Sequence, residues 1–162
     1  MNKRNYISLA NKAANIQINE LKKVKKIFNS SFIEAVDLIL NCKGKVIFAG
    51  IGKSGLIARK ISATFSSVGI PSFFCDPAQA LHGDMGQIEK KDILIIFSYS
   101  GNTSELTNML KYANRYRIKI IGVASKPDST LLKASDIKLL LPKVKEADVT
   151  GMVPTTSTTI TL

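Results

Sequence analysis

Two short segments rich in glycine and hydroxyl residues are candidates for anion binding. The first is Gly50-Ile51-Gly52-Lys53-Ser54-Gly55, between an apolar run and a helical pattern. The second, residues 98–103, follows another apolar run and is called the phosphate loop below. Its candidate donors are Ser98, Ser100, Gly101, Asn102 and Thr103. Glycines let the backbone approach an anion, and the N–H groups of a following helix then face it. Both segments therefore predict phosphate binding.

Each segment also has other interpretations. Gly50-x-Gly52-x-x-Gly55 matches the dinucleotide-binding fingerprint, with Asp76 about 20 residues further on, so a nucleotide-dependent oxidoreductase is an alternative function. A tight strand–helix turn without a ligand is another. In the phosphate loop, Asn102 and Glu105 have capping-box spacing, which would explain these two residues by helix capping alone. Capping does not require Ser98 or Ser100.

Four charged residues are candidates for chemistry: Lys53, His82, Glu105 and Glu146. If neutral hydroxyls and amides hold the phosphate, these side chains are free to move protons or stabilise charge. A third hydroxyl cluster, residues 155–159, contains Ser157 and lies at a predicted helix start. Taken singly, the lysine could be solvated, Glu105 a cap and Glu146 a loop carboxylate.

The apolar pattern predicts the elements that position these residues. Five apolar runs are expected to be strands: 45–49, 71–75, 92–97, 119–124 and 137–141. Helices are predicted at 6–28, 32–40, 56–67, after residue 103 to about 116, and at 129–134, with a turn-rich segment at 77–86. Strands that alternate with helices indicate an α/β fold with a parallel sheet beneath helices. Loops at the carboxyl ends of parallel strands are expected to share one crevice.

Composition and charge restrict the classes of partner that this chain is expected to bind. The chain has 162 residues, enough for one domain, and a net charge of +11. Its lysines are spread along the chain, and the densest group, at 22, 23, 25 and 26, is interpreted as the solvated face of an amphipathic helix rather than a nucleic-acid site. No apolar run is long enough for a membrane span. Cys42 and Cys75 fit no metal spacing and are interpreted as buried thiols in a reducing cytoplasm.

Several of these motifs together resemble the sugar isomerase (SIS) domain of D-arabinose 5-phosphate isomerases. The resemblance rests on both glycine–hydroxyl segments, on Ala80-Leu81-His82-Gly83-Asp84, on Lys145-Glu146-Ala147 and on the hydroxyl run Pro154–Thr159. It covers about residues 43–162 and, more weakly, the N-terminal helices. We therefore expect residues 1–42 to form helices that pack on a SIS domain at 43–162.

The resemblance implies a fold and an activity. The expected fold is a three-layer αβα sandwich with a five-stranded flavodoxin-like sheet, in a homo-oligomer, dimer or tetramer. The implied reaction interconverts D-ribulose 5-phosphate and D-arabinose 5-phosphate at the start of 3-deoxy-D-manno-octulosonate synthesis, for lipopolysaccharide or capsule. A sugar-phosphate sensor without catalysis is the alternative on the same fold. Neither a redox cofactor nor a required metal is expected.

Site roles carry over residue by residue. Lys53, Glu105 and Glu146 are the expected catalytic residues, with Glu146 as first choice for the proton shuttle and Lys53 at the oxyanion. His82 is expected to contact sugar hydroxyls or assist ring opening. The other expected substrate-binding residues are Gly52, Ser54, Asp76, Ser98, Ser100, Gly101, Asn102, Thr103 and Ser157. Asp76 stands where similar proteins often have a histidine that holds an inhibitory zinc, so it is also the one candidate metal ligand.

The end of the sequence departs from the family pattern. Pro154–Thr159 predicts a helix start, and only a few residues follow it. Family members continue with more helix, a Ser-His-Pro-Gly-Gly stretch with another catalytic histidine, and commonly a pair of CBS modules. We therefore expect the SIS domain to be incomplete at its C-terminus and this chain to isomerise poorly by itself.

Overall fold

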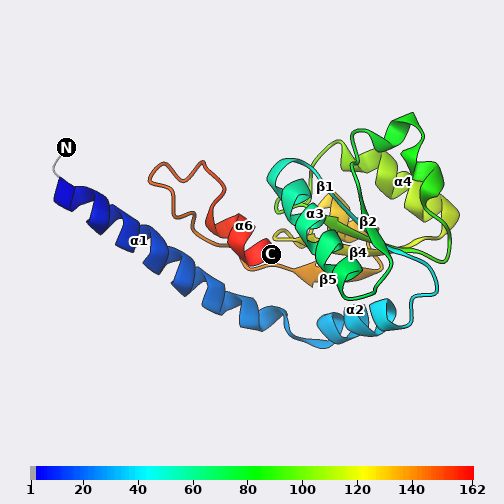
Figure 1. The fold of residues 1–162 in the computed structure, drawn as a ribbon, viewed down its shortest axis with the longest axis horizontal. Coiled ribbons are helices and arrows are strands. Elements are labelled where there is room, and N and C mark those ends of the chain that lie inside the picture. The colour runs from blue at the N-terminus through cyan, green and yellow to red at the C-terminus, as the bar shows by residue number, and fades with distance from the viewer. Residues whose placement is uncertain (1–2) are drawn as a thin grey trace.

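A five-stranded parallel sheet lies at the centre of the structure, a computed structural model that describes residues 3–162 (Figure 1). The strands are β1 (Val46–Gly50), β2 (Ser72–Cys75), β3 (Ile93–Phe97), β4 (Lys119–Ala124) and β5 (Ile137–Leu140). They are parallel and lie in the order β2-β1-β3-β4-β5, which is the flavodoxin-like order. The predicted α/β fold and five-stranded sheet are confirmed.

Helices cover both faces of the sheet. On one face, α4 (Leu106–Tyr116) and α5 (Thr130–Ala134) pack on strand residues such as Ile47 and Leu94. On the other, α2 (Ser30–Leu40), α3 (Gly52–Ser67) and α6 (Thr156–Thr161) pack on the alternate residues, such as Phe48 and Ile95. Because both faces of the central strands are buried, β1, β3 and most of β4 are continuous apolar runs, as is typical of a parallel sheet. The three layers predicted from the resemblance are therefore present.

The N-terminal arm differs from its prediction. A single helix was expected over residues 6–28, but α1 (Lys3–Leu21) is followed by a 3-10 helix, η1 (Lys22–Ile27). Leu21, Val24 and Ile27 recur every third residue, which is the period of a 3-10 helix rather than an α-helix. Val24 and Ile27 pack against the core, while the lysines of η1 are exposed. Figure 1 shows α1 extending away from the sheet with α6 beside it.

Helix α3 begins four residues earlier than predicted, at Gly52 instead of Leu56. The first glycine segment is therefore largely the first helical turn. Gly55 makes this possible, because a Cβ atom there would lie 2.6 Å from the carbonyl oxygen of Gly50. The turn can thus pack directly on the end of β1, and its backbone amides lie next to the sheet edge.

Two 3-10 turns, η2 (Ala80–His82) and η3 (Asp84–Gln87), occupy the segment predicted to be turn-rich. Along residues 3–162, no helix has the length and apolar character needed to cross a membrane.

Candidate sugar-phosphate site

The two predicted anion-binding segments leave the sheet side by side. Gly50 at the end of β1 is in register with Phe97 at the end of β3. The chain passes from β1 to β2 on one side, whereas β3 lies on the other, so this is the topological switch point where open α/β sheets bind ligands. A cavity of about 370 Å³ opens here. Its predicted site residues are Lys53, Ser54, Ser98, Ser100, Thr103, Glu146 and Ser157.

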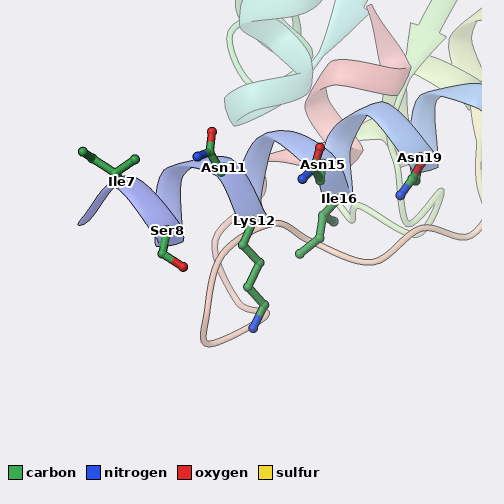
Figure 2. Close-up of a pocket in the computed structure, with 7 residues that line it drawn as sticks. All are labelled: Ile7, Ser8, Asn11, Lys12, Asn15, Ile16 and Asn19. Atoms are coloured by element: carbon green, nitrogen blue, oxygen red, sulfur yellow. The ribbon is translucent and has the colours of Figure 1, made fainter. Parts of the chain in front are cut away.

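A larger depression, about 640 Å³, lies elsewhere, along α1 (Figure 2). All of its lining residues belong to this one helix, from Ile7 to Asn19. Figure 2 shows Lys12 and Ile16 pointing to one side of the helix and Asn11 to the other, so this is an open helix surface. None of the predicted site residues lies there, and the smaller cavity at the switch point is the better candidate.

The phosphate loop is folded around Ser98, a residue that is 4% exposed. Its hydroxyl accepts the N–H of Gly101 at 3.1 Å and is 2.8 Å from the Thr103 hydroxyl. Ser98 therefore shapes the loop from inside. Ser100 is exposed beside the cavity, and its Oγ accepts only a long hydrogen bond, 3.3 Å, from the Asn102 N–H. Ser100 is thus the hydroxyl of this loop that is best placed to reach a ligand.

Contacts with α5 hold the loop from behind. Asn102 Oδ1 accepts the N–H of Thr130 at 2.9 Å and its hydroxyl at 3.2 Å. Gly101 has φ +68°, and a Cβ atom there would lie 2.2 Å from Ser129 Oγ, so only glycine fits. Helix α4 begins after Glu105 without a side-chain cap. The capping-box interpretation of Asn102 and Glu105 is therefore wrong, because the asparagine is used by a different helix.

The first turn of α3 provides the opposite wall. The first N–H groups of any α-helix have no acceptor within the helix, and those of Lys53 and Ser54 lie beside the cavity. Both side chains line the cavity, and the Lys53 ammonium makes no salt bridge with any described residue. Gly52, with φ +58°, begins this turn without lining the cavity. The wall thus combines unsatisfied amides, a hydroxyl and a cation.

Glu146 brings a carboxylate to the same cavity and caps the start of α6. Its Oε2 accepts the Thr155 N–H at 2.8 Å, the Thr155 hydroxyl at 2.9 Å and the Ser157 N–H at 3.2 Å. Partial burial alone would raise the pKa of Glu146, but the hydrogen bonds from Ser157 and Thr155 outweigh it and lower the pKa below its ordinary value. Glu146 is therefore an ionised carboxylate at neutral pH.

Besides Gly52, Gly101 and Asn102, three predicted site residues do not line this cavity. Glu105 is exposed, and a hydrogen bond from the Ser104 hydroxyl at 2.7 Å lowers its pKa. His82 is exposed at the end of η2. Asp76 follows β2 and lines a separate cavity with Arg59 and Asp84. The structure thus brings Lys53 and Glu146 together, but not Glu105, His82 or Asp76.

The surroundings of Asp76 do not form a metal site. Its Oδ1 accepts the N–H of Ala78 at 3.0 Å, and the Arg59 guanidinium shares its cavity. Cys75 is buried next to it, and burial together with Asp84 and Asp76 raises the pKa of the thiol to about 11. Over residues 3–162, no group of three His, Cys, Asp or Glu side chains is placed so that it could hold a metal ion. The residues present therefore do not fit a bound metal ion.

Sequence reasoning missed Tyr99, which lines the cavity between two predicted serines. Its hydroxyl accepts the N–H of Val144 at 3.0 Å and donates to the carbonyl oxygen of Pro142 at 3.3 Å. These partners are more than 40 residues away along the chain, so no local pattern could reveal them. Thr158 and Thr161 of α6 also line the cavity, and only Thr158 fell within the predicted hydroxyl cluster.

Comparison with known proteins defines the class to which this fold and site belong. The model of the SIS domain family matches residues 39–162. The chain therefore belongs to the SIS domain family, and the predicted resemblance is confirmed.

Individual relatives are more specific. The chain is 41% identical, over 142 residues, to arabinose 5-phosphate isomerase KdsD of Escherichia coli K12, covering 88% of this chain and 43% of that protein. It is 43% identical, over 138 residues, to arabinose 5-phosphate isomerase KpsF of E. coli O6:H1, covering 85% and 42%. The chain spans half or less of the length of such relatives.

A solved structure extends the likeness to the whole fold. The E. coli CFT073 protein c3406, in complex with arabinose 5-phosphate, superposes with a TM-score of 0.93 at 35% identity. The match covers 99% of this chain and 85% of that one. The N-terminal arm is therefore part of the shared fold.

Proposed function

We propose that this domain is an aldose–ketose isomerase that interconverts D-arabinose 5-phosphate and D-ribulose 5-phosphate. The observation that carries the proposal is the meeting of Lys53 and Glu146 in one cavity with the hydroxyl side of the phosphate loop. The names of KdsD and KpsF and the sugar-phosphate complex of the related structure support this substrate. Family membership favours it over the dinucleotide alternative.

The phosphate is anchored between the two loops. Ser54 and Ser100, with the free amides at the start of α3, donate to its oxygens, and Ser98 and Thr103 keep the loop in shape. Gly52, Gly101 and Asn102 support this anchor through the backbone and through α5. Ser157, at the start of α6, faces the sugar from the opposite side.

The reaction moves one proton between two carbons. Glu146 removes the proton from C2 of arabinose 5-phosphate and returns it to C1, while the O2 hydroxyl proton passes to O1. Composition is unchanged, and the intermediate is an enediolate. The Lys53 ammonium, which has no carboxylate partner among residues 3–162, stabilises the negative oxygen. The lowered pKa of Glu146 keeps it in the ionised form that can accept a proton.

Glu105, His82 and Asp76 keep their predicted roles only as secondary proposals. Glu105 is the second candidate for the proton shuttle, and His82 and Asp76 are the candidates for further contacts with the sugar. Their position outside the cavity favours one further candidate function, a module that binds sugar phosphate without turnover.

The domain is also proposed to act as a homo-oligomer in the cytoplasm. Apolar side chains on the N-terminal arm are exposed, including Tyr6, Ile7, Ile18 and Leu21, and a second copy would cover them. Free thiols at Cys42 and Cys75 suit a reducing compartment. Sedimentation of the purified chain tests whether it forms a homo-oligomer.

Binding and turnover separate the candidate functions. Calorimetry with arabinose 5-phosphate, with inorganic phosphate and with NAD determines which ligand the cavity accepts, and a coupled assay measures ribulose 5-phosphate. The isomerase proposal expects sugar-phosphate binding, no NAD binding, and turnover that falls in Lys53→Met but not in Lys60→Met, an exposed lysine on the same helix. Sugar-phosphate binding with neither turnover nor solvent exchange of the C2 proton would favour the non-catalytic module, and binding of NAD alone would refute both.

A further inference from the structure

Tyr99 connects the two parts of the candidate site. Its backbone carbonyl accepts the N–H of Ser125 at 2.9 Å and the Ser125 hydroxyl at 2.7 Å, which fixes it to the residue after β4. Its ring is partly buried and packs against the core on the face covered by α2 and α3. The phenol oxygen therefore projects from a rigid part of the sheet edge.

The segment that carries Glu146, residues 142–155, begins where the sheet ends. The N–H of Leu141 donates to the Ala124 carbonyl at 2.8 Å, and this is the last backbone hydrogen bond that the chain makes with β4 before the segment begins. Within the described chain, residues 142–146 make no backbone–backbone hydrogen bond. The Tyr99 hydroxyl supplies hydrogen bonds instead. It accepts the N–H of Val144, two residues before Glu146, and donates to the carbonyl oxygen of Pro142.

Glu146 is therefore fixed from two directions. On its C-terminal side, the Thr155 and Ser157 donors hold its carboxylate at the start of α6. On its N-terminal side, Val144 packs against the core, and the only side-chain hydrogen bonds to residues 142–145 among the described residues are those of the Tyr99 phenol. A phenylalanine at this position would fill the same volume in the core, so packing alone does not require the hydroxyl.

We propose that Tyr99 is a positioning residue whose hydroxyl sets the distance between the phosphate anchor and the Glu146 carboxylate. The proposal rests on the function proposed above for Glu146. Tyr99 lies within the phosphate loop, and its hydroxyl forms hydrogen bonds with the Glu146 segment. The position of the loop therefore helps to set the position of the Glu146 segment. Proton transfer is sensitive to the placement of the base, whereas phosphate binding depends on the loops alone.

The test compares Tyr99→Phe with Tyr116→Phe, a matched loss of a hydroxyl from an exposed tyrosine at the end of α4. Loss of the Tyr99 hydroxyl and its hydrogen bonds is expected to speed amide exchange at Val144 by about 3- to 10-fold. It is also expected to lower kcat by about 3- to 10-fold. KM for arabinose 5-phosphate is expected to stay within about 2-fold, because uniform binding is retained. The carboxyl resonance of Glu146, measured without substrate, is expected to shift in Tyr99→Phe alone.

The readouts separate the two levels of the proposal. If the parent chain shows neither turnover nor solvent exchange of the C2 proton, the isomerase function fails, and exchange at Val144 with the Glu146 resonance decides the positioning role by itself. Unchanged exchange and an unchanged resonance in Tyr99→Phe would overturn that role. A lower melting temperature with kcat, exchange and resonance equal to the parent would also overturn it, because the hydroxyl would then serve stability only.

Discussion

The phosphate loop and the Glu146 segment are built in different ways. The loop, residues 98–103, follows a central strand and is closed by backbone and serine contacts, with Ser98 and Gly101 buried. The Glu146 segment, residues 142–155, follows the edge strand β5 and is held mainly by side chains. Asp148 illustrates this, because its Oδ2 accepts the N–H groups of Thr150, Met152 and Val153. The anchor is thus part of the sheet, whereas the carboxylate is attached to it.

This difference suits the two tasks of an isomerase. A phosphate anchor has the same partner throughout the reaction, so a rigid loop loses little entropy on binding. A base that serves both C1 and C2 must reach two carbons, and a segment with few backbone hydrogen bonds has the lower local stability that small shifts require. Substitutions matched between the two regions test this contrast.

The largest contrast is expected between two glycines with similar backbone angles. Gly101 in the loop has φ +68° and would place a Cβ atom 2.2 Å from Ser129 Oγ, whereas Gly151 in the Glu146 segment has φ +70° and open space around it. Gly101→Ala adds overpacking to the unfavourable φ and is expected to lower the free energy of unfolding by about 3 kcal/mol. Gly151→Ala carries only the angular penalty, about 1 kcal/mol. Denaturant titration measures both, and equal losses would show that the loop is no more rigid than the segment.

The next effect concerns ligand binding at the loop. Ser100→Ala is expected to weaken arabinose 5-phosphate binding by about 1–3 kcal/mol, because a hydrogen bond to a charged phosphate is lost. Ser104→Ala is the matched control, since the Ser104 hydroxyl donates to Glu105 outside the cavity. Calorimetry on both variants decides, and equal affinities would leave Ser100 without a role in binding.

Acid is expected to loosen the Glu146 segment before the loop. The pKa of Glu146 is lowered in the folded chain, so its stabilisation is present above the ordinary value of 4.5 and is lost as the pH falls through the lowered pKa. Amide exchange at Thr155 and Ser157 should therefore accelerate on acidification relative to a Glu146→Gln variant, which has no such titration. The Gly101 amide donates to a serine and should show no comparable change. Parallel behaviour of the three amides would contradict this assignment.

The smallest effect is expected where the N-terminal arm meets the site. The Thr159 hydroxyl of α6 donates to Gln17 Oε1 of α1 at 2.8 Å. Gln17→Met keeps the shape but removes the acceptor, and should lower the free energy of unfolding by about 1 kcal/mol or less. Asn19→Ala, on the exposed side of α1, should have no effect. A loss several times larger in Gln17→Met would mean that the arm supports the Glu146 segment more strongly than this contact indicates.

The strands of the sheet were predicted well, because the apolar pattern that marks each strand is local in the sequence. All five strands were placed to within one residue at either end, since each is a short and largely apolar run, and the central strands are buried on both faces. The phosphate loop was also predictable, because glycine and hydroxyl residues directly follow such a run. The break after Leu21 was not predicted, although the three-residue spacing of Leu21, Val24 and Ile27 carried the signal.

The rest of the site depends on contacts between distant residues. One of the two interpretations made Asn102 a cap of its own helix, but Asn102 pairs with Thr130, and Tyr99 pairs with Pro142 and Val144. Hydrogen bonds of this kind leave no periodic pattern in the sequence. The grouping of Lys53 with Glu146, and the separate position of Glu105, likewise follow from the strand order and from the path of the chain after β5.

The most direct test of the account is solvent deuterium exchange at C2 of arabinose 5-phosphate, followed by proton NMR. The parent chain is expected to wash out the C2 proton, and Glu146→Gln to do so about 10²–10⁴ times more slowly while calorimetry shows binding retained. Glu105→Gln, outside the cavity, is expected to exchange at close to the parent rate. Exchange that persists in Glu146→Gln, or is lost in Glu105→Gln instead, would contradict the assignment of Glu146 as the base.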